Sequence, residues 1–259
     1  MGRRWGQHFL RSQGVIDRIV AGGELEQDGK VLEIGPGEGV VTRGLCAQAS
    51  QVHAFEIDPD LAARLRDHGP ANLIVHEGDF LKQDLSPLAE GGEPWTVVAN
   101  LPYYITAPIL DRLLWDRPLP LRHAVLMMQK EVAERICRPA HRDAGALTYI
   151  VGAFHKVEYL FTVPPGCFAP PPKVDSAVIK VVPEGLDADD PRPALAPLYE
   201  RLVSTAFGQR RKQMGRSLRS MDASAPDRLE AAGIDPARRP ETLTVEEFWT
   251  LARTWANSV

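Results

Sequence analysis

Carboxylates and glycines alternate in one short segment, which runs from Glu33 through Gly35 and Gly37 to Glu38. The segment directly follows an apolar run of strand length, and its glycines permit a tight turn from strand to helix with close approach of a ligand to the backbone. Such a turn commonly holds a pyrophosphate at a helix N-terminus, but two carboxylates would repel a phosphate. The segment therefore favours a ligand that carries positive charge.

Two further carboxylates end the next two expected strands. Glu56 stands about 20 residues after the glycine turn, where a carboxylate can accept hydrogen bonds from both ribose hydroxyls. Asp79 ends the third strand and can accept from an adenine amine, while Phe80 offers an apolar wall. Any one of these carboxylates, taken alone, could equally well be a solvated loop residue. Together, the three strand-end carboxylates and the two glycines predict a site for S-adenosylmethionine, a cationic nucleoside.

The fourth expected strand is followed by Asn100, Leu101, Pro102 and Tyr103. The functional groups of this segment suit methylation of an aromatic amine. Hydrogen bonds from the amine to the Asn100 amide oxygen and the Leu101 carbonyl would push the nitrogen toward the pyramidal geometry of the transition state. Pro102 biases Leu101 to an extended conformation, and Tyr103 can stack on a base that is turned out of a helix. A surface turn would explain an arbitrary Asn-x-Pro-Tyr equally well. Its place after a strand, in line with the carboxylates, predicts methyl transfer to adenine.

Short apolar runs that alternate with amphipathic segments must position these residues. The strand-length runs are 30–34, 52–56, 73–76, 95–99 and 124–128, and the helical segments are 13–21, 42–49, 59–68, 107–115 and 130–137. Ser12 and Asp58 are expected to cap the helices that follow them. Two more runs, 156–163 and 174–182, are joined by a short proline-rich loop and should form an antiparallel hairpin. The pattern predicts an α/β Rossmann-like fold of the class I methyltransferase type, with a seven-stranded, mostly parallel sheet.

A second, all-helical domain is expected after the acidic, proline-bearing linker at residues 183–193. Helical patterns follow over 194–207, 209–221, 226–232 and 244–255. Thr244 and Glu247 have the spacing of a capping box for the last of these helices. We therefore expect a catalytic, cofactor-binding domain over residues 1–183 and a small helical RNA-binding domain over residues 194–259.

Composition excludes several classes of protein. The cysteines Cys46, Cys137 and Cys167 have neither disulfide nor metal-ligand spacing, which predicts a metal-free protein of the reducing cytoplasm. No apolar run approaches the ~20 residues that span a bilayer, and the N-terminus has no signal-peptide pattern. No heptad repeat demands a dimer, so a monomer is expected.

The net charge of −4 argues mildly against nucleic-acid binding, but positive charge is concentrated locally. The clusters are Arg3, Arg4 and Arg11; Arg135, Arg138 and Arg142; and Arg210, Arg211, Lys212, Arg216 and Arg219. A solvated helical face is the default interpretation of any one such run. Because the last cluster lacks interleaved acids, we assign RNA binding to Arg210, Arg211, Lys212 and Arg216.

The chain resembles the ribosomal RNA adenine dimethyltransferase family over essentially its whole length. The matching segments are 6–10, 33–42, 56–58, 78–79, 100–104, 129–132, 168–176 and 207–212. The resemblance implies that His8 and Leu10 border the cofactor and that Asn100 contacts both the cofactor and the target. It also implies that Phe168 faces Tyr103 across the target base. It further implies that the substrate is two adjacent adenines near the 3′ end of 16S rRNA, with a role in ribosome biogenesis. Relatives usually have a longer arm before Gly6 and an Asn before Ser217.

Three alternatives remain open at this stage. Relatives that methylate one adenine of 23S rRNA and confer macrolide resistance usually have Ile at the position of Leu101. A ribosome-assembly factor that has lost catalysis would be expected to lack some of the strand-end residues. A DNA adenine methyltransferase shares the Asn-x-Pro-Tyr chemistry but typically carries a larger recognition domain than this helical tail.

Overall fold

The computed structural model describes residues 7–209 and 211–257 of the chain. One sheet has the strand order β4-β3-β2-β5-β6-β9-β7. Its strands are β2 Lys30–Ile34, β3 Gln51–Glu56, β4 Leu73–Glu77, β5 Trp95–Asn100, β6 Leu121–Gln129, β7 His155–Val163 and β9 Ser176–Pro183. Parallel pairing joins β2 to β3, β3 to β4, β2 to β5 and β5 to β6, whereas β6 and β9 pair antiparallel. The prediction of a seven-stranded, mostly parallel sheet is confirmed.

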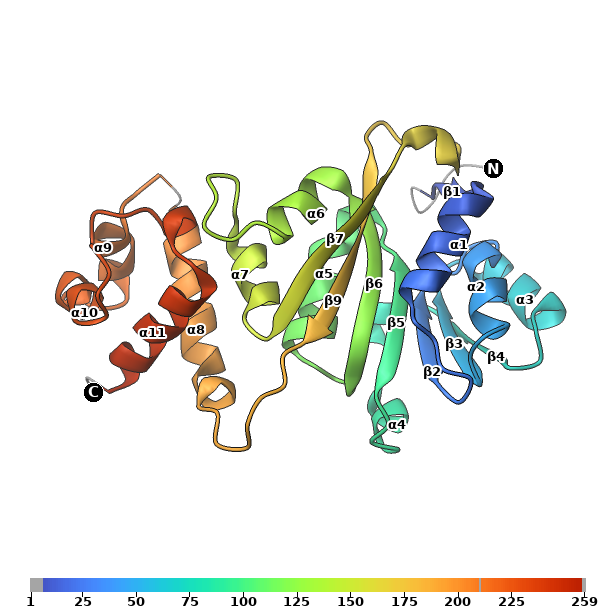
Figure 1. Cartoon of the computed structure of the whole chain (residues 1–259), viewed down its shortest axis with the longest axis horizontal. Helices are drawn as coiled ribbons and strands as arrows, with labels where there is room; N and C mark the ends of the chain where they lie inside the picture. Colours follow the sequence, from blue (N-terminus) through green and yellow to red (C-terminus); the bar gives the residue numbers. More distant parts are fainter. Residues whose placement is uncertain (1–6, 210, 258–259) are drawn as a thin grey trace. The chain divides into compact units, whose positions relative to one another are not determined.

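The central strands are apolar on both faces because helices cover a parallel sheet on both sides. Val31 and Leu32 of β2 and Val97 of β5 have no solvent exposure. The covering helices are α1 Gln13–Gly22, α2 Val40–Cys46, α3 Pro59–His68 and α5 Thr106–Leu110, the last of which continues into the π-helical turn η3 Asp111–Trp115. The short helix α4 Ser86–Ala89 buries none of its residues. Figure 1 shows α1, α2 and α3 grouped beside β2, β3 and β4.

The two predicted helix caps differ in outcome. The Asp58 carboxylate accepts hydrogen bonds from the backbone N–H groups of Asp60 and Leu61, so it caps α3 as predicted. Ser12 stands at the N-terminus of α1, but its side chain makes no capping hydrogen bond. That prediction was wrong, and the first turn of α1 is instead bonded to the Ser12 carbonyl.

A two-stranded ribbon that the sequence did not predict ties the N-terminal segment to the loop before β9. Its strands are β1 Phe9–Leu10 and β8 Phe168–Ala169, which pair antiparallel. The Arg11 N–H extends the contact by donating to the Cys167 carbonyl at 2.7 Å. Residues separated by about 160 positions in the chain are therefore backbone neighbours.

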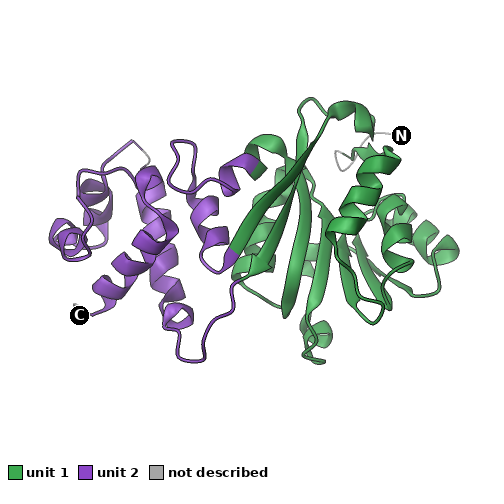
Figure 2. Cartoon of the chain, viewed as in Figure 1, with its two compact units in different colours: residues 1–133, 156–183 green, residues 134–155, 184–259 purple. Residues whose placement is uncertain are grey.

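The chain divides into two compact units, drawn in different colours in Figure 2. The sheet unit contains residues 1–133 and 156–183, and the helical unit contains residues 134–155 and 184–259. The helical unit comprises α7 Ala146–Gly152, α8 Arg192–Phe207, α9 Met214–Ser217, α10 Ala225–Ala231 and α11 Val245–Ala256, with 3-10 turns η5 Leu218–Ser220 and η6 Pro240–Thr242. Helix α6 Lys130–Ile136 crosses the first boundary.

Residues 134–155, which were expected to belong with the sheet, pack with the helical unit instead. The reason is aromatic packing and buried hydrogen bonding. The Tyr149 hydroxyl donates to the Leu243 carbonyl at 2.7 Å, and the Trp249 indole donates to the Ala153 carbonyl at 3.1 Å. Tyr199 stacks on Trp249 with ring centroids 4.0 Å apart. These long-range contacts are not visible as a pattern in the sequence.

The basic segment after α8 also departs from its prediction as one helix over 209–221. Helix α8 ends at Phe207, and α9 begins only at Met214. Between them the chain turns, and the N–H groups of Met214 and Gly215 donate to the carbonyls of Arg238 and Pro236. These backbone bonds to another segment replace the hydrogen bonds that a continuous helix would have made.

The capping box predicted for the last helix is confirmed. The Glu247 N–H donates to Thr244 Oγ1 at 3.1 Å, and the Thr244 N–H donates to Glu247 Oε2 at 2.7 Å. Across residues 7–209 and 211–257, no helix is both long enough and apolar enough to cross a bilayer. Within the same ranges, His, Cys, Asp and Glu side chains form no group that could hold a metal ion.

Candidate active site

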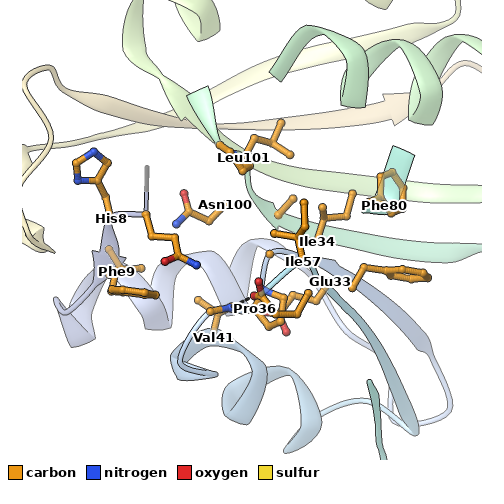
Figure 3. Close-up of a pocket in the computed structure, with 18 of the residues that line it drawn as sticks. His8, Phe9, Glu33, Ile34, Pro36, Val41, Ile57, Phe80, Asn100 and Leu101 are labelled. Carbon is orange, nitrogen blue, oxygen red and sulfur yellow. Dashed lines mark hydrogen bonds between the residues drawn. The ribbon is translucent and has the colours of Figure 1, made fainter. Parts of the chain in front are cut away.

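All of the cofactor-binding and catalytic residues predicted from the sequence border one pocket of the sheet unit. They are His8, Leu10, Glu33, Gly35, Gly37, Glu56, Asp79, Phe80, Asn100, Leu101, Pro102, Tyr103 and Phe168. The pocket holds about 1270 Å³ of empty space, part of which is open solvent. In Figure 3, His8 and Phe80 lie on opposite sides of the view, with Asn100 between them. The carboxyl ends of β2, β3 and β5 thus meet at this pocket, as expected for an open parallel sheet.

The glycine turn forms part of the pocket wall, and its backbone requires glycine. Gly35 and Gly37 have φ angles of +72° and +59°, a region that other residues rarely adopt. A Cβ on Gly37 would lie 3.3 Å from the Phe9 ring, and one on Gly35 would lie 3.4 Å from the Asn100 carbonyl oxygen. The turn therefore packs against both the N-terminal segment and the end of β5.

The Glu56 carboxylate is 3% exposed and is held by backbone amides. Its Oε2 accepts from the Gly37 N–H at 3.0 Å, and its Oε1 accepts from the Asp58 N–H at 2.9 Å. Burial raises the pKa of Glu56, and the amide hydrogen bonds oppose that rise. Since a carboxylate oxygen can accept more than one hydrogen bond, both oxygens can still receive a ligand hydroxyl.

The Glu33 carboxylate differs because its Oε2 is buried and has no hydrogen-bond partner. Burial raises the pKa of Glu33 to about 8, and the nearby Glu56 charge contributes to the rise. A buried, unpartnered carboxylate oxygen is costly unless a cation or a hydrogen-bond donor reaches it. Glu33 is therefore suited to a ligand ammonium group, in agreement with the positive charge of S-adenosylmethionine.

Asp79 and two phenylalanines form another wall of the pocket. Asp79 Oδ1 accepts from the Leu81 N–H at 3.0 Å and so caps the 3-10 turn η1 Phe80–Lys82. Phe80 is 5% exposed and packs edge-on against Phe55, with ring centroids 5.4 Å apart. This wall offers a carboxylate and apolar rings, which is the combination that an adenine needs.

Residues 100–103 run from the end of β5, and hydrogen bonds hold their backbone at several points. The Leu101 N–H donates to the Met127 carbonyl at 2.9 Å. The Pro102 carbonyl accepts from the Thr106 hydroxyl and from the Ile105 N–H, each at 3.1 Å, which fixes the 3-10 turn η2 Tyr103–Ile105. Pro102 has φ −59° and ψ 129°. The segment is thus a rigid platform rather than a loose surface turn.

The rings of His8 and Tyr103 lie roughly parallel beside the pocket, 6.1 Å apart between centroids and inclined by 28°. Each has a hydrogen bond to the segment before or at the start of β9. His8 Nδ1 lies 2.8 Å from the Pro170 carbonyl oxygen, and Tyr103 Oη lies 2.7 Å from Ser176 Oγ. Burial raises the pKa of the Tyr103 phenol, so it stays protonated at neutral pH.

Phe168 lines the pocket but is 5% exposed and belongs to the apolar core. It pairs with Leu10 across the β1–β8 ribbon, and both side chains pack in a cluster that includes Ile16. Its expected role as an aromatic wall opposite Tyr103 stays a prediction.

Among the lining residues that were not singled out from the sequence are Gln7, Phe9 and Ile57. Gln7 Nε2 donates to Asp58 Oδ2 at 3.4 Å and so joins the N-terminal segment to the end of β3. The available signals were weak, because Gln7 and Phe9 only flank His8 and Ile57 only follows Glu56.

The expected RNA-binding residues belong to the helical unit. Arg211 and Lys212 lie in the turn between α8 and α9, Arg216 lies on α9, and all three are exposed. Arg210 lies outside the described residues. Phosphate contact requires cations that are exposed in this way.

Comparison with known proteins identifies the family. The model of the family "Ribosomal RNA adenine dimethylase" matches residues 2–257. A protein of Pseudomonas fluorescens named ribosomal RNA small subunit methyltransferase A is 42% identical, over 96% of this chain and 92% of that protein. A dimethyladenosine transferase from Plasmodium falciparum superposes with a TM-score of 0.80 at 27% identity, over 96% of this chain and 98% of that one. The 23S rRNA methyltransferase ErmE superposes with a TM-score of 0.73 at 30% identity, over 95% and 98% of the two chains.

The donor set of the pocket fits S-adenosylmethionine, the cofactor of this family: an unpartnered buried carboxylate oxygen, a second carboxylate with free lone pairs, and an aromatic wall. The strand-end residues that a non-catalytic relative would be expected to lose are all present at the pocket. With the class I fold, this pocket and the match over residues 2–257, the chain belongs to the ribosomal RNA adenine dimethylase family of S-adenosylmethionine-dependent methyltransferases.

Proposed function

We propose that this chain dimethylates the exocyclic amines of two adjacent adenines near the 3′ end of 16S rRNA, in the small ribosomal subunit or its precursor, as a step of ribosome biogenesis. One observation carries the chemistry: residues 100–103 and the three strand-end carboxylates border the same pocket. Figure 3 labels Glu33, Asn100 and Leu101 among them. The small-subunit target is supported by the names of relatives about 40% identical over nearly the whole chain.

On the cofactor side, we assign Glu33 to the ammonium group, Glu56 to the ribose hydroxyls and Asp79 to the adenine amine. Phe80 would pack on the adenine ring, with Phe55 behind it. When bound, S-adenosylmethionine supplies an electrophilic methyl group on a sulfonium. The carboxylates would bind and orient it, and their negative charge would favour the cationic cofactor over the neutral product.

On the acceptor side, the Asn100 amide oxygen and the Leu101 carbonyl would accept hydrogen bonds from the target amine. These bonds oppose the delocalisation of the nitrogen lone pair into the ring, so they strengthen as the transition state forms. Tyr103 would stack on the base, with Phe168 as a second apolar contact. His8 and Leu10 would border the cofactor next to this site. No strong base is needed to raise the nucleophilicity of the amine.

We assign cofactor binding and catalysis to residues 1–183 and RNA binding to the helical residues 194–259. Arg211, Lys212 and Arg216 are exposed cations suited to phosphate, and Arg210 completes the proposed set. A single chain supplies every pocket residue, so a monomer would suffice. A ribosomal substrate implies that the enzyme acts in the cytoplasm.

The decisive experiment incubates the enzyme with labelled S-adenosylmethionine and, separately, unmethylated small subunits, large subunits and naked rRNAs. Nuclease mapping and mass spectrometry of the labelled nucleosides then identify the modified positions and the number of methyl groups. We expect two adjacent dimethyladenosines in small-subunit RNA. Label confined to large-subunit RNA would overturn the proposal in favour of the 23S activity. The structural similarity to the 23S rRNA methyltransferase ErmE makes this the alternative to test.

A further inference from the structure

Ser176 touches the acceptor side of the pocket through one hydrogen bond. Its Oγ lies 2.7 Å from Tyr103 Oη, and the serine side chain has no solvent exposure. The two residues are 73 positions apart in the chain. The chemistry assigned above to Asn100 and Leu101 does not use this serine.

The backbone around Ser176 is held in place on two sides. Ser176 begins β9 and pairs with Gln129 at the end of β6. Directly before it, the Asp175 carbonyl accepts from the Lys130 N–H at 3.0 Å, and the Asp175 carboxylate lies 3.7 Å from Lys130 Nζ. The serine hydroxyl is therefore presented from a strand end with little freedom to move.

The neighbouring ring is held by the same segment. His8 Nδ1 lies 2.8 Å from the Pro170 carbonyl, and because a carbonyl only accepts, Nδ1 carries the hydrogen. Pro170 and Ser176 both belong to residues 168–176, which lead from β8 into β9. One segment thus sets the positions of both rings, which lie 6.1 Å apart and nearly parallel.

We propose that Ser176 is a positioning residue of the methyl-transfer reaction: its hydrogen bond fixes the Tyr103 ring in the orientation that receives the target base. The inference rests on the proposed function, since only a base substrate makes the tyrosine ring a stacking platform. A tyrosine ring without a partner for its hydroxyl samples more orientations. Binding a base must then order the ring, and that ordering weakens binding in the reactive geometry.

Two substitutions remove the same hydrogen bond from opposite ends. Ser176→Ala and Tyr103→Phe should each lower kcat/KM for the RNA roughly three- to tenfold, the usual effect of one neutral hydrogen bond. The affinity for S-adenosylmethionine, measured by calorimetry, should be unchanged in both. The double variant should be no worse than either single variant, because the bond can be lost only once.

Ser50→Ala is the matched control, because Ser50 Oγ lies 2.9 Å from the carbonyls of Asp28 and Gly29, and Ser50 does not line the pocket. It should retain wild-type kinetics. Full activity of Ser176→Ala, or losses that multiply in the double variant, would overturn the positioning role. Failure of the proposed function is distinguishable, because the wild-type enzyme would then methylate no adenine of small-subunit RNA, whatever the kinetics of the two variants.

Discussion

The two sides of the pocket are built in different ways. The cofactor side consists of Glu33, Glu56 and Asp79, each within two residues of the end of a parallel strand, and its hydrogen bonds mostly join residues close in sequence. The acceptor side combines the end of β5 with Ser176, which comes from the start of β9, and its Tyr103 ring lies beside His8, the residue that we assign to the border of the cofactor. Local geometry therefore creates the cofactor site, whereas the acceptor site exists only once distant segments have met.

This difference has a consequence for function. Carboxylates fixed by neighbouring amides need only the strand and its turn, and parallel sheets bring strand ends together at one edge. Rings fixed by long-range hydrogen bonds depend on the β1–β8 ribbon and the start of β9. We therefore expect substitutions on the cofactor side to change binding of S-adenosylmethionine, and substitutions on the acceptor side to change methyl transfer.

The largest effect is expected from Asn100→Ala. Loss of an acceptor that acts mainly in the transition state should lower kcat about 10²–10³-fold, the range seen when one such group is removed. Cofactor affinity should fall only modestly, because Asn100 stands at the acceptor end. Single-turnover methyl transfer and calorimetry measure the two quantities. Turnover within a few-fold of wild type would show that the amide is not part of the chemistry.

The next largest effect is expected from Glu33→Gln. The free enzyme holds Glu33 protonated below about pH 8, and the carboxyl group must ionise to pair with an ammonium. Affinity for S-adenosylmethionine should therefore rise by up to about tenfold per pH unit until about pH 8 and then level off. The Gln variant should bind roughly 10- to 100-fold more weakly at pH 8, as for loss of a charge-assisted hydrogen bond, and should lose this pH dependence.

Glu77→Gln is the control for that experiment. Glu77 ends β4, much as Glu33 lies next to the end of β2. The Glu77 side chain, however, is 45% exposed, is paired with Arg66, and does not line the pocket. Its affinity and pH profile should match those of the wild type. A pH dependence that persists in Glu33→Gln would assign the titration to another group.

A smaller effect is expected in the helical unit. Replacing Arg211 and Lys212 with Ala should weaken binding to small subunits and lower the slope of log affinity against log salt by about 0.7–0.9 per lost phosphate contact. Cofactor affinity should not change. Replacing Arg64 and Lys156, two exposed cations of the sheet unit, removes the same charge as a control. Equal slopes for the two double variants would reject a specific phosphate site at residues 211–212.

The smallest effect is expected from Gly37→Ala, which tests the join between the two sides. The φ of +59° and the 3.3 Å approach of a Cβ to Phe9 should lower the free energy of unfolding by about 1–2 kcal/mol. Thermal unfolding measures this loss. Because Gly37 also donates to Glu56, cofactor binding should weaken in parallel. Unchanged stability would show that neither the positive φ nor the approach to Phe9 restricts this position to glycine.

The acidic, proline-bearing composition of residues 183–193 predicted the domain boundary. Hydrophobic periodicity predicted the sheet and most of its helices, because burial on both faces of a parallel sheet leaves continuous apolar runs. It failed for residues 209–221, where backbone bonds to Pro236 and Arg238 replace a helix. The sequence also placed residues 134–155 in the sheet unit. Tyr149 instead buries its ring and hydroxyl in the helical unit. Both errors arise where long-range contacts override a local preference.

By itself, the sequence predicted which strand-end residues border the pocket, including Asn100–Tyr103, since strand ends and turns follow from local patterns of burial and glycine. Only the tertiary structure decided that one carboxylate oxygen of Glu33 has no partner, that Phe168 is part of the core, and that Ser176 bonds to Tyr103. The physical reason is that hydrogen-bond satisfaction and burial depend on which distant segments pack together. Neither property is encoded in residue type and spacing alone.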